Sequence, residues 1–322
     1  MKTTIVRLLT FCFAAFATVV VLTYAQPFFY RKFNSSDKRF LTLLDNVHKK
    51  DDNILVFGDS RTVLGVDTKR VKAKLGTPAE IYNVGNFSQD MYQSGYFYGM
   101  VGDNTRMVVQ CTTTAFFSKD KPVDIPDAKT IPMFLSGYKL NDATRSVMGN
   151  TKSFFDNSDF ENNLKSRVYF ENYITTAIRP LLDNEKYDEG RIMDPYFPHI
   201  YVEQRSPNYP VQPIGCDKYK PQSKPVSQLA FLKRARDYFK SKNIKYVMVL
   251  MPINPDDCDN AAGYSAEFAK MIRSEVGIDV IDLTTLVKVP DFYDAVHPNH
   301  KGAEIVSDAF AAQLKQLVPE KK

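Results

Sequence analysis

The sequence predicts an α/β fold in which a mostly parallel, five-stranded sheet is covered by helices on both faces. Five short runs of apolar and β-branched residues recur along the chain, and segments with helical spacing alternate with them. The first two runs end in a glycine, Gly58 and Gly85, as expected where a strand gives way to a tight turn. Alternating strands and helices are typical of parallel sheets, whose strands are buried on both faces.

The composition is that of a globular protein. Of the 322 residues, 44% are hydrophobic and 25% are charged, which argues against a disordered chain, a coiled coil or a multi-span membrane protein. The 42 Lys and Arg exceed the 37 Asp and Glu by only five, and they are dispersed, so a nucleic-acid partner is not expected. Four Cys without a C-x-x-C pair disfavour a disulfide scaffold and a zinc ribbon. No metal or organic cofactor is expected.

Residues 1–26 form a separate N-terminal segment. A start containing Lys2 and Arg7 precedes an uncharged run, Leu8–Ala25, which spans roughly 27 Å as a helix. It is either a cleaved signal peptide, with Thr23-Tyr24-Ala25 near the cleavage site, or an uncleaved membrane anchor. We favour the anchor, because the run is longer than the apolar core of a signal peptide. Both alternatives export residues 27–322, to the cell envelope or, after cleavage, as a secreted protein; a buried soluble helix is the least favoured alternative.

The first part of the domain supplies three strands and three helices. A helix is expected over residues 37–50, with Leu43 and Val47 on its apolar face. Another begins at Asp67 or Thr68, and a third covers residues 90–101. The strands are expected over residues 53–57, 81–84 and 107–113.

A proline- and aromatic-rich stretch, about residues 118–225, interrupts the alternation. Only residues 164–182 within it have strong helical spacing, and we interpret the stretch as an insertion or cap that sets specificity. The alternation then resumes through the C-terminus. Helices are expected over residues 228–242, 267–275 and 302–317, with strands over 245–251 and 278–282.

Ser60 is the candidate nucleophile. Ligands of parallel sheets bind beyond the carboxyl ends of the strands, and Gly58-Asp59-Ser60 follows the first strand directly. The serine hydroxyl and its backbone N–H should therefore face the same space. A serine hydroxyl is a weak nucleophile by itself and requires a base. Asp59 is expected to fix the turn, and Arg61 either forms a structural ion pair or holds an acidic group of the substrate.

Asp294 and His297 are the candidate partners of Ser60. They lie three residues apart after the fifth strand, in Asp294-Ala295-Val296-His297-Pro298-Asn299. This spacing lets the carboxylate hold the imidazole Nδ1–H while Nε2 faces a serine. A lone histidine is usually a surface or core residue, and we expect that of His300, which has no aspartate three residues before it.

Acyl transfer also needs N–H donors for the developing alkoxide. The backbone N–H groups of Ser60 and Gly85 are the candidate donors, and the Asn86 side chain is a third. Glycine at position 85 would let the chain approach closely. The alternative interpretation of residues 83–86 is a simple turn.

These motifs resemble blocks one, two and five of the SGNH/GDSL hydrolase superfamily, in Ser60, Gly85 and the Asp294/His297 pair. The resemblance covers residues 53–117 and 227–317 and implies a flavodoxin-like, three-layer α/β/α fold with Ser-His-Asp chemistry. One departure stands out, because the family's third block, Gly-x-Asn-Asp, is absent after the strand over 107–113. A threonine hydroxyl or a backbone N–H is the candidate substitute. With the N-terminal segment, Gly-Asp-Ser-Arg-Thr and the insertion, the chain is similar to the exported DltD-like and alginate-O-acetyltransferase-like branch.

The resulting expectation is a membrane-tethered serine esterase or O-acyltransferase acting on carbohydrate esters of the cell envelope. The branch implies a membrane-bound O-acyltransferase as a partner. The alternative is a non-catalytic envelope factor that keeps the fold to bind a polymer or a membrane partner. In an oxidising compartment Cys216 and Cys258, both in polar loop sequence, are able to pair, although the sequence gives no distance between them.

Overall fold

The computed structural model describes residues 4–18, 43, 46, 47, 49, 52–87, 89–120, 142–149 and 215–319. The helix expected over residues 37–50 is described at four positions, where Leu43 and Val47 are fully buried. The helix expected over residues 164–182 and most of the predicted insertion lie outside the described residues.

The described residues contain a five-stranded, all-parallel sheet, as predicted. Its strand order is β2-β1-β3-β4-β5, the order of flavodoxin-like doubly wound sheets. After β1 the chain adds β2 on one side of it and then β3 on the other side. The direction in which strands are added therefore reverses between β1 and β3. The strands are β1 (Asn53–Phe57), β2 (Glu80–Asn83), β3 (Thr105–Thr112), β4 (Lys245–Leu250) and β5 (Asp279–Asp282).

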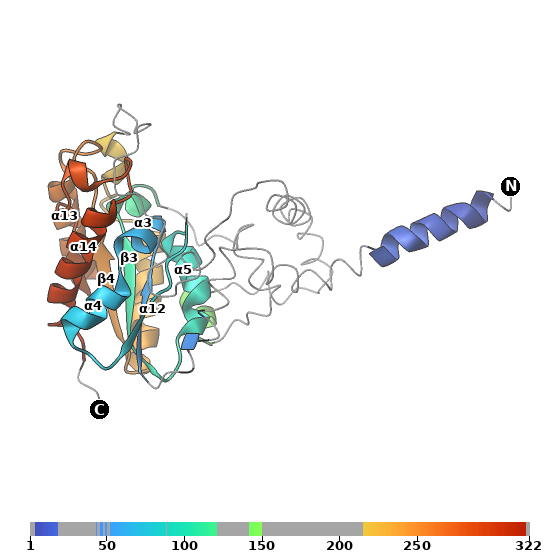
Figure 1. Cartoon of the computed structure of the whole chain (residues 1–322), viewed down its shortest axis with the longest axis horizontal. Helices are drawn as coiled ribbons and strands as arrows, with labels where there is room; N and C mark the ends of the chain where they lie inside the picture. The colour runs from blue at the N-terminus through green and yellow to red at the C-terminus, as the bar shows by residue number, and fades with distance from the viewer. Residues whose placement is uncertain are drawn as a thin grey trace.

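Helices cover both faces of the sheet and complete three layers (Figure 1). Alternate residues of β1 point to opposite faces, as in any strand: Ile54 packs into one hydrophobic core and Leu55 into the other. The face of Ile54 is covered by α4 (Thr68–Leu75) and α14 (His300–Leu314). The opposite face is covered by α5 (Met91–Phe97), α7 (Asp142–Met148), α12 (Val226–Ser241) and α13 (Ala261–Glu275).

The helix bounds depart from the expectations where apolar spacing is a weak signal. The helix α13 begins at Ala261 rather than at residue 267, because Gly263 and Ser265 weaken the helical pattern of its first turns. The short helices α3 (Ser60–Gly65) and α7 were not expected, since six or seven residues give too few turns to establish a period. The expected helix over residues 90–101 is divided into α5 and the 3₁₀ turn η1 (Tyr98–Met100).

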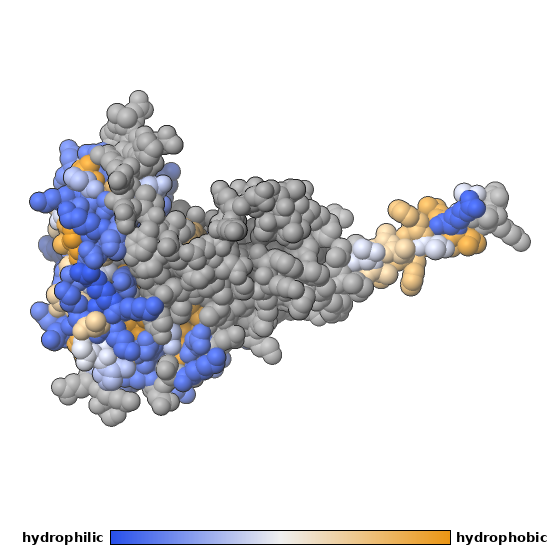
Figure 2. Space-filling model, viewed as in Figure 1, coloured by the Kyte–Doolittle hydropathy of each residue, from blue (hydrophilic) through white to orange (hydrophobic). Residues whose placement is uncertain are grey.

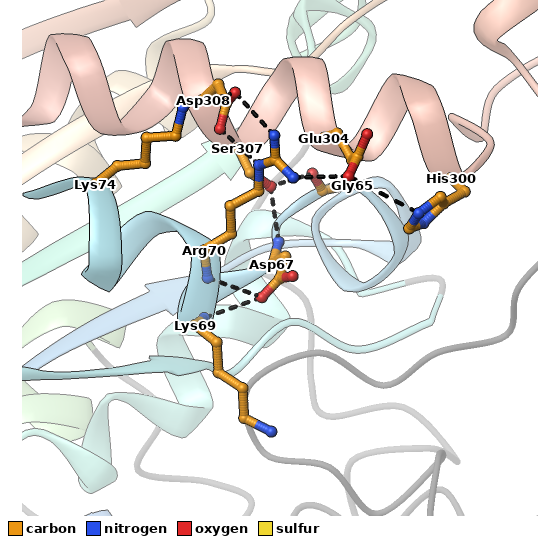
Figure 3. Close-up of polar contacts among 9 residues, drawn as sticks. All are labelled: Gly65, Asp67, Lys69, Arg70, Lys74, His300, Glu304, Ser307 and Asp308. Atoms are coloured by element: carbon orange, nitrogen blue, oxygen red, sulfur yellow. Dashed lines mark hydrogen bonds and ion pairs between the residues drawn. The ribbon is translucent and has the colours of Figure 1, made fainter.

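Contacts between α4 and α14 join the first part of the domain to its last helix (Figure 3). The Arg70 guanidinium donates from Nε to Asp308 at 2.6 Å and from Nη1 to Glu304 at 2.7 Å. Ser307 Oγ accepts a hydrogen bond from the Asp67 backbone N–H at 2.9 Å. The helices α3 and α4 follow β1, and α14 follows the loop of residues 292–299. These bonds therefore hold the segment after β1 against the last helix of the sheet domain.

The Arg70–Asp308 pair should make stability depend on pH. The hydrogen bond from Arg70 lowers the pKa of Asp308 to about 2, from an ordinary value of 3.8. A lowered folded-state pKa means that the stabilisation is complete above the ordinary value and is lost as the pH falls from about 4 to about 2. We expect Asp308→Asn to cost about 1 kcal/mol or less at neutral pH, because the pair is partly exposed.

Thermal unfolding of the wild type, Asp308→Asn and the exposed control Asp237→Asn, from pH 7 to pH 2, tests this. The wild type should lose its advantage over Asp308→Asn between pH 4 and pH 2. An advantage that is undiminished at pH 2 would contradict the assignment.

Residues 4–18 form a helix with apolar side chains along it (Figure 2). Several of these are more than 60% exposed, among them Leu8, Phe11 and Phe16. Among the described residues, no helix combines the length and the apolar character needed to cross a bilayer. Residues 19–26 of the predicted anchor lie outside the described residues, so the anchor and the signal peptide both stay predictions.

Candidate active site

Ser60 is the first residue of α3, immediately beyond the carboxyl end of β1. Asp59 caps this helix, and its Oδ1 accepts a hydrogen bond from the Arg61 backbone N–H at 2.9 Å. Gly58 is required by close packing, because a Cβ there would overlap Thr62 Oγ1 and lie 2.9 Å from the Cys111 Cβ. The turn therefore holds Ser60 at the edge of the sheet with its backbone fixed on both sides.

His297 and Asp294 lie on a tight loop between β5 and α14. An antiparallel bridge joins Phe292 to Pro298 across the base of the loop, and the Tyr293 N–H donates to the His297 carbonyl at 2.8 Å. Asn299 caps α14, with its Oδ1 accepting from the Gly302 N–H at 3.0 Å. These bonds set the loop against the start of α14.

The structure brings the three predicted residues into one chain of hydrogen bonds. His297 Nδ1 lies 2.7 Å from Asp294 Oδ2, and His297 Nε2 lies 2.8 Å from Ser60 Oγ. A carboxylate can only accept, so Nδ1 carries the proton and the lone pair of Nε2 faces the serine hydroxyl. In this tautomer the Ser60 O–H donates to His297, which is the arrangement that a general base requires.

Asp294 is held as a carboxylate. Burial favours its neutral form, but the hydrogen bonds from the His297 ring and from the Val296 and His297 backbone N–H groups outweigh burial and lower its pKa. Both backbone groups donate to Oδ1 at 2.8 Å, which leaves Oδ2 to the imidazole. The carboxylate is thus charged near neutral pH and can stabilise a protonated His297.

The three predicted oxyanion donors differ in their availability. The Ser60 backbone N–H has no hydrogen-bond partner within the described part of the chain. The Gly85 N–H donates to Asn83 Oδ1 at 3.1 Å, so it is already engaged. Asn86 Oδ1 accepts from the Phe87 N–H at 2.9 Å, and its own backbone N–H donates to the Gly58 carbonyl at 3.0 Å. The bond to Gly58 places Asn86 beside the turn that carries Ser60. Because Oδ1 is engaged by Phe87, the side chain has Nδ2 as its hydrogen-bond donor.

A cavity of about 340 Å³ lies between the carboxyl ends of β1 and β3, where the strand order reverses. This is the position at which doubly wound sheets bind ligands. Thr112 and Thr113, from the segment in which a threonine hydroxyl was expected to act as a donor, are among the residues that line it, and the Thr112 hydroxyl donates to the Thr113 carbonyl at 3.3 Å. The lining comprises Asp59, Ser60, Arg61, Gln89, Asp90, Met91, Cys111, Thr112, Thr113, Ala115 and Phe116. A larger cavity of about 590 Å³, lined by Arg106, Lys240 and Lys245 among others, includes none of the predicted site residues.

Arg61 forms the structural ion pair that was one of its two expected roles. Its Nη1 donates to Asp59 Oδ2 at 2.7 Å. Burial alone would lower the pKa of Arg61, but the negative charge of Asp59, together with hydrogen bonds to Asp59 and Tyr219, raises it overall. Sequence reasoning missed Tyr219, because this buried residue lies in loop sequence far from every motif.

Cys216 and Cys258 form a disulfide, with their Cα atoms 4.4 Å apart. It joins the 3₁₀ turn η3 (Cys216–Tyr219) to the loop that follows β4. Asp259 lies close to the two sulfurs, but bonded sulfurs cannot serve as thiolate ligands for a metal ion.

No protein-family model, curated protein or solved structure matches this chain. A function for the chain must therefore be inferred from the chemistry around Ser60.

Proposed function

We propose that this protein is an exported, membrane-tethered serine acyl-transfer enzyme of the SGNH type. The hydrogen-bond chain from Asp294 through His297 to Ser60 carries the proposal, with contacts of 2.7 and 2.8 Å. Residues 237 positions apart in the sequence meet in this chain, at the carboxyl edge of a parallel sheet. A binding module that uses no covalent chemistry has no need of this arrangement.

The reaction begins when His297 Nε2 takes the proton of Ser60 Oγ as the oxygen attacks the carbonyl carbon of an ester. The tetrahedral intermediate collapses, and protonated His297 gives its proton to the leaving alcohol. The acyl group is then bonded to Ser60. In the second half, His297 deprotonates an acceptor hydroxyl, which attacks the acyl-Ser60 ester and restores the free serine.

The developing alkoxide needs donors in a fixed position. The Ser60 N–H is available, and the Asn86 Nδ2 is a second candidate beside the same turn. The Gly85 N–H could contribute only by leaving Asn83. Thr113, which lines the cavity, is the candidate for the place of the family's asparagine, because the Thr112 hydroxyl donates to the Thr113 carbonyl at 3.3 Å.

The acceptor in the second half is either water, which makes the protein an esterase, or a carbohydrate hydroxyl, which makes it an O-acyltransferase. We favour the transferase, on the grounds of the predicted N-terminal anchor and the long insertion. A cell-envelope polymer would supply the hydroxyl, and a membrane-bound O-acyltransferase would be the partner that supplies the acyl group. The cavity, at the small end of ligand pockets, suits a short acyl chain.

Labelling with a fluorophosphonate tests whether Ser60 is an activated nucleophile. The full chain is purified in mild detergent, treated with the probe, digested and mapped by mass spectrometry, with heat-denatured protein as the control. We expect one modified serine, Ser60, and none after denaturation, because activation requires the folded His297–Asp294 pair. Absence of the label from Ser60, under conditions that label a known serine esterase, would remove the main support for an enzyme.

Product analysis then separates the two acceptors. The same protein is incubated with a small acetyl ester, with and without added oligosaccharides. Acylated sugar establishes a transferase, whereas release of acid that is unaffected by the sugars indicates an esterase.

A further inference from the structure

The loop after β4 contacts the loop that carries Asp294 and His297. No sequence motif predicted this contact. It runs from Met251 to Asn260, between β4 and α13. Asn254 in this loop is completely buried, and its Nδ2 donates to the backbone carbonyl of Asp294 at 3.3 Å. The residue whose carboxylate orients His297 is thus itself held by a side chain from another element.

Asn254 is fixed by its own loop. Its side-chain Oδ1 accepts from the Asp256 N–H at 3.0 Å, and this bond sets which way the amide faces. Its backbone carbonyl accepts from the N–H groups of Asp257 and Cys258, at 2.9 and 3.2 Å. These bonds orient the amide nitrogen toward the Asp294 carbonyl.

The Cys216–Cys258 disulfide anchors this loop to η3. Tyr219 reinforces the link, since its hydroxyl donates to Asp257 Oδ2 at 3.2 Å. Asp257 is only 3% exposed, so its charge requires this bond and the nearby Lys218, whose Nζ lies 3.6 Å away. The loop is thus joined to η3 just after Asn254, by the disulfide and by the contacts of Asp257 with Tyr219 and Lys218.

We propose that Asn254 is a positioning residue for the Ser60 site, acting through Asp294, and that the Cys216–Cys258 disulfide holds it in place. The Asn254 amide holds the Asp294 peptide so that the carboxylate Oδ2 stays aligned with His297 Nδ1. The disulfide prevents the loop from drifting away from the catalytic loop. This inference rests on the proposed function of Ser60, His297 and Asp294.

Two substitutions of Asn254 test the role of its hydrogen bond to the Asp294 carbonyl. Asn254→Asp keeps the shape and the oxygen that accepts from Asp256, but it turns a carboxylate oxygen toward the Asp294 carbonyl. Asn254→Ala removes the contact altogether. The matched control is Asn260→Asp, which makes the same chemical change at an exposed position of the same loop.

Hydrolysis of a small acetyl ester by the full chain gives the first measurement. We expect kcat to fall by about 10-fold or more in both Asn254 variants, since small misplacements of reacting groups are costly. KM should stay within about two-fold of the wild type, because Asn254 lies outside the cavity beside Ser60. Asn260→Asp should behave as the wild type. Unchanged kcat in folded Asn254→Asp and Asn254→Ala would overturn the proposal.

A double-mutant cycle tests the disulfide. The paired change Cys216→Ser and Cys258→Ser should lower kcat in the same direction, with circular dichroism confirming that the fold is retained. Adding Asn254→Ala to it should cost much less than Asn254→Ala costs alone, because both changes disrupt one contact. Fully additive losses would mean that the disulfide does not act through Asn254 and would overturn that part of the proposal.

A measurement independent of turnover separates this inference from the proposed function. The proton between His297 Nδ1 and Asp294 gives a strongly deshielded nuclear magnetic resonance signal when the pair is aligned. We expect the signal in the wild type and in Asn260→Asp, and its shift or loss in both Asn254 variants. If the wild type showed no Ser60-dependent turnover, the proposed enzymatic function would be refuted. The nuclear magnetic resonance signal would then test by itself whether Asn254 positions Asp294. A signal that is the same in all variants would overturn it.

Discussion

Replacing Ser60 with alanine should lower kcat for a small acetyl ester by about 10⁶-fold, the loss seen when a triad serine is removed. Ser60 Oγ lies 2.8 Å from His297 Nε2, and the described residues place no other hydroxyl on that nitrogen. Alanine removes the attacking atom while leaving the Asp294–His297 pair and the backbone N–H of residue 60 in place. Turnover of the full chain, with and without the substitution, is followed by release of the alcohol.

The control for this prediction is Ser274→Ala, which removes an exposed serine hydroxyl on α13. It should retain wild-type turnover. Hydrolysis by Ser60→Ala at more than a small fraction of the wild-type rate would show that another group is the nucleophile. Melting temperatures of both variants should stay close to that of the wild type, because neither change opens a cavity in the core.

The strands were predictable because each is a short apolar run with a clear end. The run over residues 53–57 coincides with β1, and the other four differ from the observed strands by one or two residues at one end or at both. Strand order was not read from the sequence; the parallel arrangement followed from the alternation with helices. The contact of Ser60 with His297 was predictable from that arrangement, since carboxyl ends of parallel strands share one edge.

Other features depend on contacts that leave no local pattern. Nothing near Gly85 indicates that its N–H is engaged by Asn83, because the bond depends on how the Asn83 side chain turns at the end of β2. Asn254 lies in a loop whose sequence indicates only a turn, yet it is completely buried beside Asp294. Such roles arise from packing between segments far apart in the sequence, which spacing cannot encode.

Replacing Asp294 with asparagine should lower kcat by about 10⁴-fold, while the shape of the site is kept. In the wild type, Oδ1 accepts two backbone N–H bonds and Oδ2 accepts from the imidazole. The asparagine oxygen will keep the two backbone donors, since an amide NH₂ cannot accept from them. The NH₂ group then faces His297 Nδ1 and requires it to be an acceptor. The proton moves to Nε2, which points a hydrogen at Ser60 Oγ and cannot take its proton.

The matched control is Asp256→Asn, which removes one exposed negative charge from the loop after β4 without touching the imidazole. It should leave kcat within about two-fold of the wild type, as expected of a surface charge. Fluorophosphonate labelling of Ser60 should slow in Asp294→Asn in proportion to turnover, because both reactions need the same proton transfer. If kcat fell no further in Asp294→Asn than in Asp256→Asn, Asp294 would not orient the base. A loss confined to Asp294→Asn would instead show that the Asp294 carboxylate fixes the tautomer of His297, through the bond that it accepts from Nδ1.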